Sequence, residues 1–197
     1  MHCIEPFTPN YNKLKLSAEV SGYDHEGFFV KNAVIAPLDG LIAFPDVYTK
    51  KSLADVSIDD CSSFMPEKIA DGRCKKMAGY TLDSYVEAHV ESKGPIHVLK
   101  IGVNGYDLDV LDGGKFSVLY LAQYIEFQFS YLAPMSLEQL GVSIDMLDKY
   151  GFTCYWAGND ILYRITGCWQ DYYNIHNLAN IACVHHKQRK LVEKMEN

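Results

Sequence analysis

The sequence predicts a single α/β domain over residues 1–197, built on a doubly wound, mostly parallel sheet that ends in an antiparallel hairpin. Three observations predict this class. The length of 197 residues and the hydrophobic content of 48% suit one globular core. Apolar strand-like runs alternate with helical patterns along the chain. Near the C-terminal end, two strand-like segments flank the dipeptide Gly158-Asn159, which is a strong hairpin signal.

The N-terminal half begins with a short apolar strand, MHCI, that Glu5-Pro6 ends. Thr8-Pro9 predicts a helix start, because threonine caps helices and proline is tolerated in their first turn. The apolar run 28–36 predicts a buried strand, and the polar stretch 46–72 predicts a loop. Residues 81–90 predict a short helix that Thr81 caps.

The C-terminal half predicts strands at 96–101 and 122–132, with the start of a helix at 106–112 between them. A longer helix follows, where Ser136 and Gln139 form a capping box and Gly151 stops the helix. We expect a last helix from residue 186. The buried face predicted for the longer helix consists of Leu140, Ile144 and Leu147.

Charge and cysteine usage exclude several function classes. The formal net charge of −7 argues against nucleic-acid binding, which needs clustered lysine and arginine. No stretch is apolar enough for a signal peptide or a membrane span. The six cysteines are scattered without a C-x-x-C pair, which favours reduced, mostly buried thiols and a cytoplasmic location. The cysteines and histidines around 183–186 fit no common zinc spacing, so no metal site is expected.

Three stretches of this sequence carry a resemblance to a known family. The central stretch, TLDSYVEAH with PIHVLKIGVNGYDLDVLDGG, resembles the pattern T-L-D followed by L-L-K-I-D-V-E-G-x-E-x-x-V-L-x-G. The stretches IEPFTPNYNKL and LDKYGFTCYWAG with LYRITGCW match the patterns before and after it. In this order they are similar to the FkbM-type S-adenosylmethionine-dependent methyltransferases, over residues 3 to about 184.

The resemblance implies a class I methyltransferase-like fold with the cofactor across the carboxyl ends of the strands. It implies methyl transfer from S-adenosylmethionine, usually to an oxygen of a sugar or small metabolite, and leaves the oligomeric state open. Glu5 then accepts hydrogen bonds from the ribose hydroxyls. Asn32 and Ala33 lie in KNAV (31–34), which matches the family's next strand, whose end usually meets the adenine. Gly102 also lies at the cofactor. The predicted catalytic residues are Lys100, Asn104 and Asp107.

The sequence also departs from the family pattern. No Gly-rich D-x-G-x-x-x-G loop precedes Glu5, and Gly102 and Asn104 stand where the family has acids. Gln128 replaces a further acid, unless Glu126 has taken over its role. Lys100 has two interpretations, as a polar residue that reaches the site or as a structural lysine with a buried stem. The alternative function is a non-catalytic module that keeps the fold to bind a partner or ligand.

This sequence has no segment that matches the first strand of the resembled fold. In that fold, the missing strand lies between the strands that correspond to residues 1–4 and 96–101. Its loss leaves two apolar strand edges without partners, which proteins normally avoid. We therefore expect either an N-terminally incomplete piece of a longer chain or direct pairing of these two strands. The start inside a motif, at MHCIEP, favours the incomplete piece.

Overall fold

The computed structural model describes residues 1–23, 27–45, 61, 73–91, 94–103, 105–129, 137–170, 173 and 179–196. The chain divides into two compact units, Met1–Tyr85 and Val86–Asn197. Each unit combines helices with strands, so the protein belongs to the mixed α/β class. The single domain over 1–197 stays a prediction.

The first unit contains two small sheets and one long helix. In one sheet β1 (His2–Ile4) pairs parallel with β2 (Phe29–Lys31). In the other, β5 (Cys74–Tyr80) pairs parallel with β3 (Val34–Ile35) and antiparallel with β4 (Gly40–Pro45). Among the described strands β1 has β2 as its only partner.

The single strand predicted over 28–36 is wrong, because β2 and β3 belong to different sheets. Asn32 lies between them, and its side-chain amide donates to the carbonyls of Glu5 at 2.9 Å and Pro6 at 3.0 Å. These bonds attach the chain to the end of β1, where β2 stops. The helix α1 (Thr8–Val20) has proline in its first turn as predicted, but Phe7 occupies the cap position and no side chain caps it.

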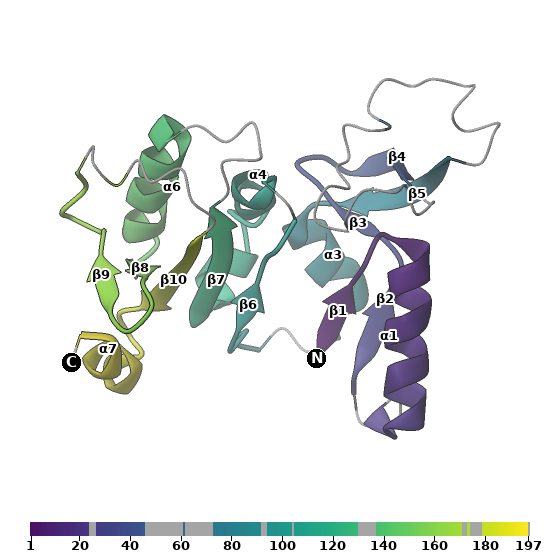
Figure 1. The fold of residues 1–197 in the computed structure, drawn as a ribbon, viewed down its shortest axis with the longest axis horizontal. Helices are drawn as coiled ribbons and strands as arrows, with labels where there is room; N and C mark the ends of the chain where they lie inside the picture. The colour runs from purple at the N-terminus through teal and green to yellow at the C-terminus, as the bar shows by residue number, and fades with distance from the viewer. Residues whose placement is uncertain are drawn as a thin grey trace. The chain divides into compact units, whose positions relative to one another are not determined.

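The second unit is built on a five-stranded sheet whose strands lie side by side (Figure 1). Their spatial order is β6 (Leu99–Lys100), β7 (Tyr124–Phe129), β10 (Ala179–His185), β8 (Phe152–Ala157) and β9 (Leu162–Arg164). The predicted hairpin is confirmed as β8–β9. β6 runs parallel to β7, whereas β10 lies antiparallel to both of its neighbours. The sheet is therefore mixed rather than mostly parallel.

The other four helices predicted from the sequence are also present. In α3 (Leu82–His89) the Thr81 hydroxyl accepts the Ser84 N–H at 3.1 Å, which confirms the predicted cap. The predicted helix start at 106–112 is α4 (Asp107–Asp112), and the last helix is α7 (Arg189–Glu196). The long helix is α6 (Leu137–Lys149); its predicted capping residue Ser136 lies outside the described residues. A short helix, α5 (Val118–Leu121), precedes β7.

The core of the second unit lies between α6 and the sheet. The predicted α6 face is confirmed, because Leu140, Ile144 and Leu147 are at most 1% exposed. α6 contacts β8, and α4 contacts both α6 and β7. β7 alternates strictly along its length, with every second side chain buried: Ile125, Phe127 and Phe129.

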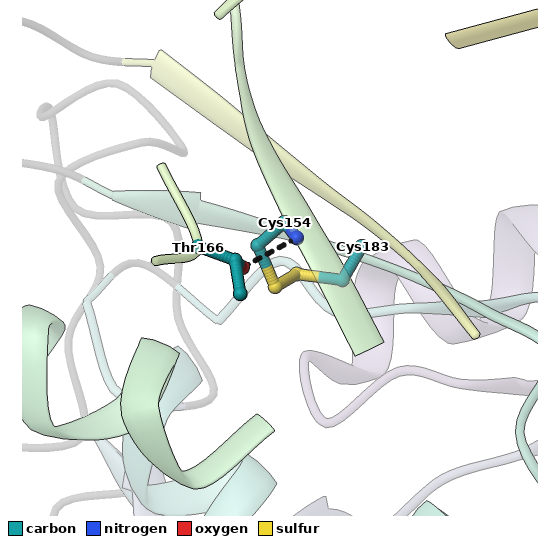
Figure 2. Close-up of a disulfide and its surroundings, with 3 residues drawn as sticks. All are labelled: Cys154, Thr166 and Cys183. Carbon is teal, nitrogen blue, oxygen red and sulfur yellow. Dashed lines mark hydrogen bonds between the residues drawn. A yellow bond between two sulfur atoms is a disulfide. The ribbon is translucent and has the colours of Figure 1, made fainter. Parts of the chain in front are cut away.

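The expectation of reduced cysteines is wrong, because four of the six form disulfides. Cys154 lies directly opposite Cys183 in the β8–β10 ladder, and opposite residues of a ladder point to the same face. Figure 2 shows this disulfide beside Thr166, whose hydroxyl accepts the Cys154 N–H at 2.8 Å. A second disulfide joins Cys61 and Cys74. Such cross-strand proximity comes from the ladder register, which the cysteine spacing does not encode.

Among the described residues, no helix combines the length and apolar character that crossing a membrane requires.

Candidate functional site

The predicted active-site turn follows β6 and leads into α4. Ile101 extends the parallel ladder, because its N–H donates to the Glu126 carbonyl at 2.8 Å. The chain then turns at Gly105, whose φ of 101° lies in the left-handed region that favours glycine. A strand, a turn and a helix therefore follow one another as the sequence predicts. They lie beside a parallel neighbour, in the position where open α/β sheets bind their ligands.

Asp107 is fully buried at the start of α4, and its carboxylate accepts backbone hydrogen bonds from two directions. Oδ2 accepts the N–H groups of Gly105 at 3.1 Å and Val103 at 3.4 Å. Oδ1 accepts the N–H of Gln128 in β7 at 3.1 Å. Burial raises the pKa of Asp107, and the backbone hydrogen bonds oppose this shift. The carboxylate thus fastens the turn to β7, and its predicted catalytic role stays a prediction.

Lys100 lies opposite Glu126 in the β6–β7 ladder, and the two side chains form an ion pair. The Tyr124 hydroxyl donates to Glu126 Oε2 at 3.2 Å. Burial and then the Glu126 carboxylate raise the pKa of Tyr124 to about 12, so the hydroxyl stays protonated and keeps donating. The Lys100 side chain is 56% exposed and that of Glu126 25%, so this cluster reaches solvent.

Two further predicted site residues follow β6 in the sequence, Gly102 and Asn104. Gly102 is exposed, and a Cβ built on it meets no atom within 4 Å. Its backbone therefore lies next to open space. Asn104 lies outside the described residues.

The other predicted site residues lie in the first unit, which is described by itself. Glu5 directly follows β1, and its Oε1 accepts the Phe7 N–H at 2.8 Å. Burial raises the pKa of Glu5, and the hydrogen bonds from Phe7 and the Asn10 side chain oppose this. Glu5 lines a surface concavity of about 330 Å³. The other lining residues come from one face of α1: Asn10, Lys13, Leu14 and Ser17.

Asn32 and Ala33 are held differently. The Asn32 amide is bound to the Glu5 and Pro6 carbonyls, so the structure brings Asn32 and Glu5 together. Ala33 is completely buried, which leaves its side chain no surface for a ligand. Asn32 therefore supports the turn that presents Glu5.

The sequence did not single out Tyr124, Asn10 or Lys13 as site residues. Tyr124 and Glu126 are two residues apart, so strand alternation alone places them on one face with Gln128. Asn10 and Lys13 are three residues apart, which is the spacing of neighbours on a helix face. Both signals were present in the sequence, although neither indicates a ligand without the tertiary structure.

Chemically, these residues offer two polar surfaces. In the first unit, a carboxylate, an amide and an ammonium side chain line a surface concavity together with Leu14 and Ser17. In the second unit, the partly exposed carboxylate of Glu126 is held by Lys100 and Tyr124 at the last residue pair of the parallel β6–β7 ladder. Comparison of the chain with protein-family models, with curated proteins and with solved structures found no match. The resemblance to the FkbM-type methyltransferases thus stays a prediction.

Proposed function

We propose that this chain has a Rossmann-like, FkbM-type methyltransferase fold and binds S-adenosylmethionine, with the hydroxyl of a sugar or small metabolite as methyl acceptor. The observation that carries the proposal is the β6–turn–α4 segment. Lys100 ends the strand, Gly105 has a positive φ, and Asp107 begins the helix, in the order of the family pattern. The strand β10, which lies antiparallel between β7 and β8, also supports the proposal.

The residues of the first unit fit the ribose of this cofactor. A carboxylate only accepts hydrogen bonds and has about four lone-pair sites, so Glu5 keeps capacity for two hydroxyls beside the bonds from the Phe7 N–H and the Asn10 side chain. Its place in the concavity makes this capacity accessible. Glu5 would hold the ribose, and Asn32 would fix the turn on which Glu5 lies. When bound, S-adenosylmethionine supplies a methyl group on a positively charged sulfur.

The residues of the second unit would position the acceptor. The exposed backbone at Gly102 permits close approach, and Lys100 and Glu126 offer a donor and an acceptor of hydrogen bonds. Because Asp107 is buried, Glu126 is the carboxylate of this cluster that can take the proton of an acceptor hydroxyl.

A second candidate function, a non-catalytic module on the same fold, is favoured by a specific observation. The Asp107 carboxylate is already occupied by backbone N–H groups, and Lys100 and Glu126 pair with each other. Gly102 offers no carboxylate where the family has one. In this alternative the cluster stabilises the sheet and transfers nothing.

Calorimetric titration of the chain with S-adenosylmethionine tests the proposal. We expect saturable heat that Glu5→Gln weakens and that the control Glu19→Gln, an exposed acid of α1, leaves unchanged. Absence of heat at millimolar cofactor contradicts cofactor binding. Binding with no methyl transfer to any of a panel of sugars and hydroxylated metabolites supports the non-catalytic module.

A further inference from the structure

The two disulfides have different surroundings, although all four cysteines are buried. Cys154 and Cys183 are 0% exposed, whereas Cys61 and Cys74 are 3% and 5% exposed. The larger difference lies in the strands that enclose them. Thiol–disulfide exchange needs a thiolate to reach a sulfur atom, so the enclosure decides which disulfide reacts.

Cys154–Cys183 lies inside the five-stranded sheet. β8 has β9 and β10 on its two sides, and β10 has β7 and β8. The Cys154 carbonyl accepts the Ile165 N–H at 2.9 Å, and its N–H donates to Thr166, so the side of Cys154 away from Cys183 is also bonded. Both cysteines are completely buried in the core of the second unit, so a thiolate reaches the sulfurs only when this core opens, at a cost near the free energy of global unfolding.

Cys61–Cys74 lies at the end of a ladder. Cys74 is the first residue of β5, and β3 pairs only with the opposite end of β5, at Gly79 and Tyr80. Among the described strands, β4 is therefore the one that flanks Cys74. The residue opposite Cys74 is Pro45, the last of β4, which has no N–H to donate. A strand end frays at a lower free energy than strands inside a sheet separate, so this disulfide lies where local opening costs least.

We propose that Cys61–Cys74 is a redox-responsive tether that exchanges with external thiols while the protein stays folded, whereas Cys154–Cys183 is a permanent cross-link. A glutathione thiolate attacks one sulfur of Cys61–Cys74, the S–S bond breaks, and a mixed disulfide forms while the leaving thiolate takes a proton. A second glutathione thiolate attacks the mixed disulfide. The products are two cysteine thiols and one glutathione disulfide, so the cysteines are reduced and glutathione is oxidised.

The proposal has a consequence for location. The predicted cytoplasmic location depended on reduced cysteines, and disulfides persist in oxidising compartments. A thiol-rich environment opens the tether between Cys61 and β5, and an oxidising one closes it. The sheet of the second unit keeps its cross-link in both.

The test follows the two pairs separately in the oxidised, full chain. The protein is incubated with reduced glutathione, alkylated with N-ethylmaleimide at intervals, and each cysteine is quantified by peptide mass spectrometry. We expect Cys61 and Cys74 to be labelled at least about tenfold faster than Cys154 and Cys183, with unchanged circular dichroism. Equal rates, the reverse order, or labelling of Cys61 and Cys74 before glutathione is added would overturn the proposal.

Two controls tie the result to the fold. In unfolding concentrations of urea the two pairs should be labelled at similar rates, because the enclosing strands are gone. A difference that persists in urea would show that the fold does not protect Cys154–Cys183. The variant Cys61→Ser/Cys74→Ser should keep the slow labelling of Cys154 and Cys183, and fast labelling in a variant that is still folded would contradict the permanent cross-link.

Discussion

The buried carboxylate of Asp107 connects the turn after β6 to β7 through hydrogen bonds to backbone N–H groups. The turn residues Val103 and Gly105 donate to one oxygen, and Gln128 of β7 donates to the other. The N–H groups of a turn that leaves a strand have no ladder partner, so a side chain must satisfy them if they are buried. The stability of this turn therefore depends on Asp107.

Asp107→Asn should lower the free energy of unfolding by about 1–3 kcal/mol, because an amide NH2 cannot accept the N–H groups that face it. Urea denaturation measures this loss. The matched control is Asp109→Asn, an exposed acid of the same helix, which should change stability by less than about 0.5 kcal/mol. If both variants lose the same stability, the carboxylate of Asp107 does not hold the turn.

His185 makes stability depend on pH. Burial, and then the nearby His186 and Lys187, lower the pKa of His185 below its ordinary 6.5. Its Nδ1 accepts the Lys187 N–H at 3.1 Å, a bond that protonation of this nitrogen breaks. The unfolded chain thus binds this proton more readily than the folded one. The contribution of His185 is complete above about pH 6.5 and is lost as the pH falls towards the folded pKa.

We therefore expect the free energy of unfolding to fall between about pH 7 and pH 5.5, and His185→Gln to reduce this dependence. Urea denaturation at several pH values measures both. A variant that loses as much stability on acidification as the wild type would show that another group is responsible.

The sequence predicted residue types at the site better than their partners. It placed an acid at the start of α4 and a carboxylate after β1, because local patterns encode caps and turns. That the Asp107 carboxylate is occupied by the N–H of Gln128 depends on a contact across 21 residues of sequence. Such a contact follows from the strand register, which composition and spacing do not encode.

At the scale of elements, Gly151 lies in the short connection between the end of α6 and the start of β8. Its φ of 90° is accessible to glycine at no steric cost, and a Cβ there would lie 2.6 Å from His186 Cε1. Its carbonyl also accepts the His186 N–H at 2.9 Å, which joins the start of β8 to the end of β10. Gly151 therefore both ends a helix and permits a close approach.

Gly151→Ala should lower the free energy of unfolding by about 1 kcal/mol or more, because alanine is strained at this φ and collides with His186. Gly102→Ala is the matched control, since its Cβ would meet no atom within 4 Å. Thermal unfolding of the two variants compares them directly. If the Gly151→Ala protein is as stable as the Gly102→Ala protein, residue 151 does not need glycine for its φ or for the close approach of His186.

Elements with a strong local signal were predicted well. The α6 face, the Thr81 cap and the β8–β9 hairpin are all confirmed, because each depends on residues close in sequence. The run 28–36 was misread as one strand, since its interruption comes from bonds between Asn32 and a segment 26 and 27 residues away. The disulfides were missed for the same reason.

At the scale of the whole molecule, the α/β class was predictable and the pairing pattern was not. Alternating strand and helix signals give the class. The place of β10 between β7 and β8 depends on a strand far along the chain, and no local signal reports it. The combination of parallel and antiparallel pairing in the sheets is therefore known only from the structure.

The central claim is that the residues of the family pattern bind S-adenosylmethionine in this chain. The most direct measurement is an NMR titration of the 15N-labelled protein with this cofactor. The account predicts a saturable shift of the amide signal of Phe7, whose N–H is bound to Glu5. Saturating cofactor that does not move this signal would contradict it.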